Sequence, residues 1–171
     1  MNRIAQFSKV SFEQFLNDYN DTFDYGQSDE EIRSIWGNIK LPTRATTDSA
    51  GYDFMVPIDF TLKAGDTIKI PTGVRCKIDE GWVLKLYPRS GLGFKYRLQL
   101  NNTVGIIDGD YFGSGNEGHI FAKITNDSNE GRIIIMSSGS GFMQGIFVPY
   151  GITIDDDAEG VRNGGFGSTG R

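Results

Sequence analysis

From Ile39 onward, apolar residues alternate with polar ones in short runs that are broken by Gly, Pro, Asn and Asp. An alternation with a period of two is typical of strands that bury one face. The clearest runs are Thr67–Pro71, Trp82–Tyr87, His119–Ile124 and Gly145–Pro149. Short strands separated by turn residues predict an all-β fold, either a barrel or a jelly roll. A chain of 171 residues has room for one such domain with a modest appendage.

The first forty residues follow a different pattern, in which apolar residues recur at helical spacing. Two capping boxes, at residues 11–14 and 28–31, mark the starts of helices. We therefore expect two short helices within residues 11–36, the second ended by Gly37 and Asn38. Their apolar faces are expected to pack on the main domain, and a surface for a protein partner is the alternative.

These patterns divide the chain into three parts. Residues 1–38 form an N-terminal helical extension, residues 39–160 a β-barrel core, and residues 161–171 a C-terminal arm. The arm is so rich in glycine that no stable helix or strand is expected there, and we expect it to be flexible without a ligand.

Composition narrows the classes of function. The formal net charge is -5 and no basic stripe is present, which argues against a nucleic-acid binder. No run approaches the length of apolar sequence that spans a bilayer, and the first residues lack the apolar core of a secretory signal. Cys76 is the only cysteine and is expected to be a buried strand residue in a reducing, cytoplasmic compartment. His119 follows a glycine-rich loop, and we interpret it as a surface histidine.

Four segments carry residues suited to phosphate or base chemistry. Pro88–Gly93 follows a strand and combines arginine, serine and glycines, a composition typical of phosphate sites. Asn101–Gly113 is an apolar run that ends in an acid, with an aromatic residue three positions later. Asp48–Asp53 is a tight turn followed by an acid. Arg162–Arg171 mixes arginine, phenylalanine and hydroxyls among glycines, which suits a flap over a planar phosphorylated ligand.

In this order, the four segments resemble the motifs of the trimeric dUTPase family. Ser49–Asp53 matches the first motif, Pro88–Gly93 the second, Gly105–Gly113 the third and Gly164–Gly170 the fifth. The spacing between Arg89 and Asp108 also agrees with bacterial members. The resemblance covers about residues 39–171 and implies a distorted jelly-roll β-barrel that hydrolyses dUTP to dUMP and pyrophosphate.

Two motifs depart from the family pattern. The fourth motif is represented by Phe142–Gly145, which keeps Gln144 but has Gly141 where an arginine is usual. Some contacts that this arginine would make with phosphate or with another subunit are therefore expected to be lost or to be made by other residues. In the fifth motif, Arg162 lies one residue nearer Phe166 than is common. Residues 114–118 look like a loop insertion.

The resemblance implies a homotrimer whose active sites are shared, with phosphate motifs, base-binding hairpin and tail coming from different subunits. It assigns Asp108 to activation of the attacking water and Arg89, Ser90 and Gly91 to the phosphates. Asp110 is the rival for the first role on the residues alone. Mg²⁺ is expected on the substrate phosphates with no direct protein ligand, supported through water by Asp53. The remaining substrate-binding residues are Asn102, Gly105, Ile106, Ile107, Tyr111, Gln144, Arg162, Phe166, Gly167, Ser168 and Thr169, with Tyr111 under the deoxyribose and Phe166 stacked on uracil.

Two other functions remain open from the sequence. One is a regulatory module of the same fold that binds a repressor or another protein through the N-terminal helices or the 114–118 loop. The other is an enzyme similar to dCTP deaminases, which the pattern of Gly105–Gly113 and the tail fit less well.

Overall fold

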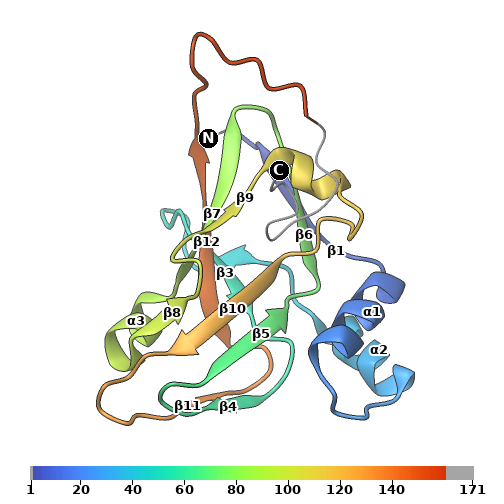
Figure 1. The fold of residues 1–171 in the computed structure, drawn as a ribbon, viewed down its shortest axis with the longest axis vertical. Coiled ribbons are helices and arrows are strands. Elements are labelled where there is room, and N and C mark those ends of the chain that lie inside the picture. The colour runs from blue at the N-terminus through green and yellow to red at the C-terminus, as the bar shows by residue number, and fades with distance from the viewer. Residues whose placement is uncertain (1, 161–171) are drawn as a thin grey trace.

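The computed structural model describes residues 2–160 and is built mainly of short strands (Figure 1). The strands are β1 (Ala5–Lys9), β2 (Thr43–Arg44), β3 (Tyr52–Met55), β4 (Phe60–Leu62), β5 (Thr67–Pro71), β6 (Val74–Ile78), β7 (Trp82–Pro88), β8 (Leu98–Leu100), β9 (Gly105–Ile107), β10 (Phe121–Asn126), β11 (Ile134–Met136) and β12 (Gly141–Pro149). The helices are α1 (Phe12–Thr22), α2 (Asp29–Asn38), α3 (Ser90–Tyr96) and the 3₁₀-helix η1 (Gly109–Gly113). None of the helices in residues 2–160 is long and apolar enough to cross a membrane.

The strands form antiparallel sheets that close into a jelly roll, as the period-two pattern predicts. The largest sheet has the order β2-β3-β12-β7-β9, and β5-β10-β8 form a second sheet. The pairs β1-β6 and β11-β4 complete the barrel. The predicted strand at Thr67–Pro71 is confirmed as β5, whereas β10 begins at Phe121, two residues later than expected.

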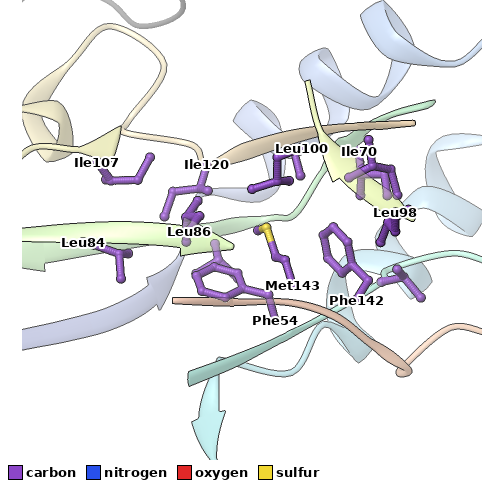
Figure 2. Close-up of a cluster of buried hydrophobic side chains, with 14 of the residues drawn as sticks. Phe54, Ile70, Leu84, Leu86, Leu98, Leu100, Ile107, Ile120, Phe142 and Met143 are labelled. Atoms are coloured by element: carbon purple, nitrogen blue, oxygen red, sulfur yellow. The ribbon is translucent and has the colours of Figure 1, made fainter. Parts of the chain in front are cut away.

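The main core lies between these sheets and is built from alternate strand positions (Figure 2). Leu84 and Leu86 of β7 point into it from one strand. In β12, the neighbours Phe142 and Met143 are both fully buried, which simple alternation forbids. The register of β12 against β3 shifts between Gly141 and Met143, and this bulge turns both side chains inward.

Both predicted N-terminal helices are present, and each begins at its predicted cap. The Ser11 hydroxyl accepts a hydrogen bond from the Gln14 amide, and Ser28 and Glu31 complete a capping box. Contrary to expectation, Gly37 and Asn38 belong to the second helix. Lys9 explains how that helix ends, because its ammonium donates to the Trp36 and Gly37 carbonyl oxygens, each at 2.8 Å.

The N-terminal extension is not only helical. Strand β1 precedes the helices and pairs with β6 along its whole length, so residues 5–9 belong to the barrel. The helices pack on the same side of the barrel through a second apolar cluster, which includes Phe15, Tyr19, Ile32 and Ile58. The predicted packing of the helical apolar face on the main domain is confirmed.

The prediction of a surface His119 is wrong. The side chain is completely buried, and its Nε2 accepts a hydrogen bond of 2.8 Å from the Gly73 amide. Its Nδ1 lies 2.5 Å from the Asp18 Oδ2 of α1. The glycine-rich loop before it folds back against α1 instead of extending into solvent, with Gly118 at a φ of 71°.

The predicted burial of Cys76 in a strand is confirmed. The side chain is 1% exposed in β6, and burial raises the pKa of its thiol to about 12. Because the thiolate is the reactive form, burial and the raised pKa make this thiol a poor nucleophile.

Candidate active site

The segment after β7 forms a turn that can bind an anion. The strand ends at Pro88, Arg89 occupies the N-cap position with an extended backbone, and α3 begins at Ser90. The amides of Ser90 and Gly91 lie in the first helical turn, where backbone N–H groups have no acceptor within the helix. A Cβ placed on Gly91 would contact nothing within 4 Å, so the backbone there is open to approach.

The Arg89 guanidinium connects this turn to two neighbouring strands. Its Nε lies 3.3 Å from the Asp53 Oδ1 of β3, and its Nη1 donates to the Gly141 carbonyl oxygen of β12 at 3.4 Å. The Arg89 side chain is 45% exposed and that of Asp53 is 19% exposed. The guanidinium is therefore oriented by the protein on one side and open to solvent on the other.

Gln144 lies beside this pair. It is opposite Asp53 in the register of β12 and β3, and its amide is 3.5 Å from the Pro88 carbonyl oxygen. A Cβ on Gly51 would come within 2.7 Å of the Gln144 Oε1, so the glycine leaves room for the Gln144 amide where it now lies. We call Asp53, Arg89, Ser90, Gly91 and Gln144 the phosphate corner. The structure brings together predicted residues from three separate motifs there.

The β8–β9 segment forms a second part of the candidate site. Strand β8 pairs with β10 and β9 pairs with β7, so the two arms of this hairpin diverge. A pocket of about 250 Å³ opens between them and is mainly apolar. Asn102 and Gly105 line it, together with Leu86, Phe121 and Met143. Its size and walls suit a small flat ring.

Backbone groups of β9 are available to such a ring. This strand stands at the edge of its sheet and, within residues 2–160, pairs with β7 alone. An edge strand presents backbone donors and acceptors that are not used in the sheet. Ile106 is 49% exposed, whereas Ile107 is 7% exposed and belongs to the core.

Asp108 follows β9 and is the N-cap residue of η1. It is half-buried at the edge of a cavity of about 510 Å³, which Trp82, Tyr150, Asp79 and Asp110 also line. No local sequence signal singles out Trp82, Asp79 or Tyr150, because only folding places them beside Asp108. Asp110, in contrast, is exposed.

Tyr111 is held firmly by the loop that follows it. Its side chain is 3% exposed, and its hydroxyl donates to the His119 carbonyl oxygen at 2.6 Å and accepts from the Asn116 amide at 2.9 Å. Only a small edge of the ring is therefore open to a sugar. The predicted contact with the deoxyribose stays a prediction.

The phosphate corner and Asp108 lie at opposite ends of β7. Leu84 pairs with Ile107, which places Asp108 level with Val83. Arg89 is six residues farther along the chain, a separation of about 20 Å at the usual rise of a strand. Figure 1 shows the same arrangement, with α3 near one end of β7 and η1 near the other. One chain therefore does not bring Arg89 and Asp108 to the same phosphate.

The predicted residues of the arm, Arg162 and Phe166–Thr169, lie outside the described residues. The preceding segment, 151–160, is exposed throughout, and it leaves the tip of β12 and then bends over toward the side of η1 (Figure 1). Within residues 2–160, no group of three or more His, Cys, Asp or Glu side chains is arranged to hold a metal ion.

Together these features define a jelly-roll protein with an anion-binding turn and, apart from it, a base-sized pocket beside an edge strand. Comparison with known proteins identifies the class more closely. The sequence profile of the dUTPase family matches residues 37–170, and the chain belongs to this family.

Sequence relatives agree with this assignment. The deoxyuridine 5'-triphosphate nucleotidohydrolase of Lactococcus lactis is 38% identical over 135 residues, which cover 77% of this chain and 89% of that protein. The protein of the same name from Haemophilus ducreyi is 39% identical over 139 residues, covering 77% and 87%.

Solved structures show the same fold. The crystal structure of dUTPase from Streptococcus mutans has a TM-score of 0.63 and 34% identity, and the match covers 88% of this chain and 98% of that one. A mutant dUTPase from phage phi11 of S. aureus, described with a structural Mg(II) ion, has a TM-score of 0.62. At 20% identity, this second likeness supports the fold alone.

Proposed function

We propose that this protein hydrolyses dUTP to dUMP and pyrophosphate by attack of water on the α-phosphorus. The observation that carries the proposal is the phosphate corner, in which three separate motifs of a dUTPase-family chain meet around Arg89. The family match favours dUTP hydrolysis over the regulatory module and over a dCTP deaminase. In addition, the 114–118 loop is engaged by α1 of its own chain, since Glu117 accepts hydrogen bonds from Ser11.

The base-binding part of the proposal rests on the hairpin pocket. The unused backbone groups of β9 can match the donor and acceptor edge of uracil, with Asn102 at the mouth of the pocket. Cytosine presents the reversed pattern and would leave buried polar groups unpaired, at a cost of about 1–3 kcal/mol each. Gly105 packs closely on Leu86, since an added Cβ would lie 3.0 Å from that side chain, and a close fit of the base at this wall would exclude the methyl group of thymine.

The phosphate corner supplies positive charge and donors. Arg89 and the amides of Ser90 and Gly91 bind phosphate oxygens and stabilise the charge that develops in the transition state. The contacts to Asp53 and Gly141 hold the guanidinium in place before substrate arrives, so its orientation costs little when the substrate binds.

Asp108 is the proposed general base. Its carboxylate orients one water and accepts a proton as that water attacks. The rigid connection of Asp108 to β9 on one side and η1 on the other fixes the direction of the carboxylate.

The residues present fit Mg²⁺ bound through the substrate. This ion prefers oxygen ligands, retains several waters and binds readily to nucleotide phosphates. The Asp53 carboxylate lies beside the proposed phosphate ligand Arg89 and is partly open to solvent, so it can accept hydrogen bonds from metal-bound water. When bound, the ion neutralises charge on the triphosphate.

The separation of Arg89 from Asp108 supports sites shared between subunits. We propose a homotrimer in which the phosphate corner of one subunit meets Asp108 of the partner subunit. The segment 151–160 is exposed throughout and is therefore accessible to a neighbouring subunit. The predicted roles of Arg162, Phe166, Gly167, Ser168 and Thr169 in closing over the nucleotide belong to this proposal. The protein is expected to act in the cytoplasm, where Cys76 stays reduced.

The test is hydrolysis of dUTP by the full-length protein with Mg²⁺, followed by separation of the nucleotides. We expect equal amounts of dUMP and pyrophosphate, with dCTP, dTTP and UTP hydrolysed far more slowly. Absence of dUMP formation, or ammonia release from dCTP, would overturn the proposal.

A further inference from the structure

Gly141 is in direct contact with the arginine of the phosphate corner. The Arg89 side chain lies across the backbone of β12 at this position and donates to the Gly141 carbonyl oxygen at 3.4 Å. At the same time its Nε pairs with Asp53 on the next strand, at 3.3 Å. The guanidinium therefore occupies the space directly above Gly141.

The backbone at Gly141 does not itself require glycine. Its φ is not positive, unlike those of Gly118 and Gly139, so any residue can adopt this conformation. The constraint is steric, and the three atoms nearest to an added Cβ all belong to Arg89. A Cβ at Gly141 would lie 2.6 Å from the Arg89 Nη1, 3.2 Å from its Cδ and 3.3 Å from its Cζ.

Relief of that clash would move Arg89 and leave the fold in place. The atoms in contact belong to the flexible end of a side chain that is 45% exposed, whereas Gly141 sits in a paired strand. The guanidinium would swing toward solvent and lose its contacts with the Gly141 carbonyl and with Asp53.

We propose that Gly141 is a positioning residue, whose missing side chain lets Arg89 lie on β12, pair with Asp53 and point toward the substrate phosphates. This inference rests on the proposed function, because it assumes that Arg89 binds those phosphates. In this chain glycine stands where the fourth motif usually has an arginine, so the Arg89 guanidinium lies in the space where that side chain would begin.

The main test is a double-mutant cycle between Gly141→Ala and Arg89→Ala, read out as kcat/KM for dUTP and as affinity for a non-hydrolysable dUTP analogue. A misplacement of about 1 Å in a catalytic group can cost about 10²-fold in rate. We expect Gly141→Ala to lower kcat/KM by about 10- to 100-fold on this basis and to weaken analogue binding. In the Arg89→Ala background, the same substitution has no guanidinium to displace, so analogue affinity should not fall further.

Two other glycines separate a positioning effect from a structural one. Gly145→Ala, on the same strand, would place a Cβ 2.8 Å from Leu84 in the core, so we expect a lower melting temperature. Gly37→Ala, in helix α2, meets nothing within 4 Å, so it should leave activity near that of the wild type and should not lower the melting temperature, because alanine has the higher helix propensity. Gly141→Ala should keep the wild-type melting temperature. An equal loss of analogue affinity in both Arg89 backgrounds would overturn the proposal.

A crystal structure of Gly141→Ala tests the same inference without any activity. We expect the Arg89 guanidinium to have left Asp53, with the backbone of β12 unchanged. An Arg89–Asp53 pair that persists in the variant would contradict the inference even if dUTP hydrolysis is confirmed. Conversely, a wild-type protein that does not hydrolyse dUTP would overturn the proposed function, whereas displacement of Arg89 in Gly141→Ala would still show that Gly141 positions this arginine.

Discussion

At the scale of single residues, the site depends on neighbours that are far apart in the sequence. Arg89 was predicted from its motif, but its contacts with Asp53 and Gly141 arise only because β12 lies between β3 and β7. For His119 the local sequence was misleading. The glycine-rich loop before it suggested an exposed side chain, whereas the side chain is buried and makes hydrogen bonds with Asp18 and Gly73. Residue type and the family resemblance identified the chemical groups of the phosphate corner but could not place their partners.

The two acids near the start of η1 should differ sharply in function. Asp108 is half-buried between β9 and η1, whereas Asp110 is exposed on the 3₁₀-helix. General-base catalysis typically contributes about 10²–10⁴-fold, so we expect Asp108→Asn to lose turnover on that scale while still binding a dUTP analogue. Asp110→Asn should be much milder.

Single-turnover hydrolysis and analogue affinity measured on both variants decide between the acids. The assignment is wrong if Asp110→Asn is the inactive protein and Asp108→Asn turns over dUTP at nearly the normal rate.

At the scale of elements, the N-terminal helices are tied to the segment that carries Tyr111. The Ser11 amide and hydroxyl donate to Glu117 at 2.8 and 2.7 Å, and Arg75 lies 3.7 Å from the same carboxylate. Arg75 in turn donates to the Phe112 carbonyl oxygen at 2.6 Å. Helix α1 therefore supports the turn after η1, a connection that no local sequence signal reveals.

This connection should depend on pH through Glu117. Partial burial by itself raises the pKa of Glu117, but hydrogen bonds from Ser11 and the charge of Arg75 hold it below its usual value of 4.5. A lowered folded-state pKa stabilises the native state above the unfolded-state pKa, and the contribution is lost as pH falls through the folded-state value. We expect Glu117→Gln to reduce the free energy of unfolding by about 1 kcal/mol at pH 7.

Urea denaturation of the wild type and Glu117→Gln, at pH 7 and again below pH 4, measures this effect. The difference in unfolding free energy should shrink at the lower pH. A difference that stays constant or grows under acid conditions would show that the carboxylate charge is not what anchors α1.

The elements themselves were largely predictable where the signals are local. The capping boxes place both N-terminal helix starts, and alternation over Thr67–Pro71 gives β5 with its observed bounds. Strand β1 was missed, because its five residues are stabilised by pairing with β6, far along the chain. The consecutive buried residues Phe142 and Met143 likewise depend on a bulge that only the register against β3 defines.

At the scale of the whole molecule, the parts of the candidate site lie far apart within one chain. The phosphate corner and Asp108 lie about 20 Å apart along β7, on the usual rise of a strand. A ring of identical subunits that contact one another through two different surfaces can bring such distant parts together. The sequence predicts shared sites only through its family resemblance, whereas the structure shows that one chain holds Arg89 and Asp108 too far apart to contact the same phosphate.

The most direct test of this account mixes two inactive variants, Arg89→Ala and Asp108→Asn, after brief dissociation and reassembly. If the sites are shared, each site takes Arg89 from one subunit and Asp108 from another. After random mixing, each of these two residues is native with a probability of about one half, so about a quarter of the sites should contain both. We therefore predict dUTP hydrolysis at up to about a quarter of the wild-type rate, with mixed oligomers verified by native mass spectrometry. If verified mixed oligomers stay inactive while reassembled wild-type protein recovers, Arg89 and Asp108 do not act across subunits and the shared-site account is contradicted.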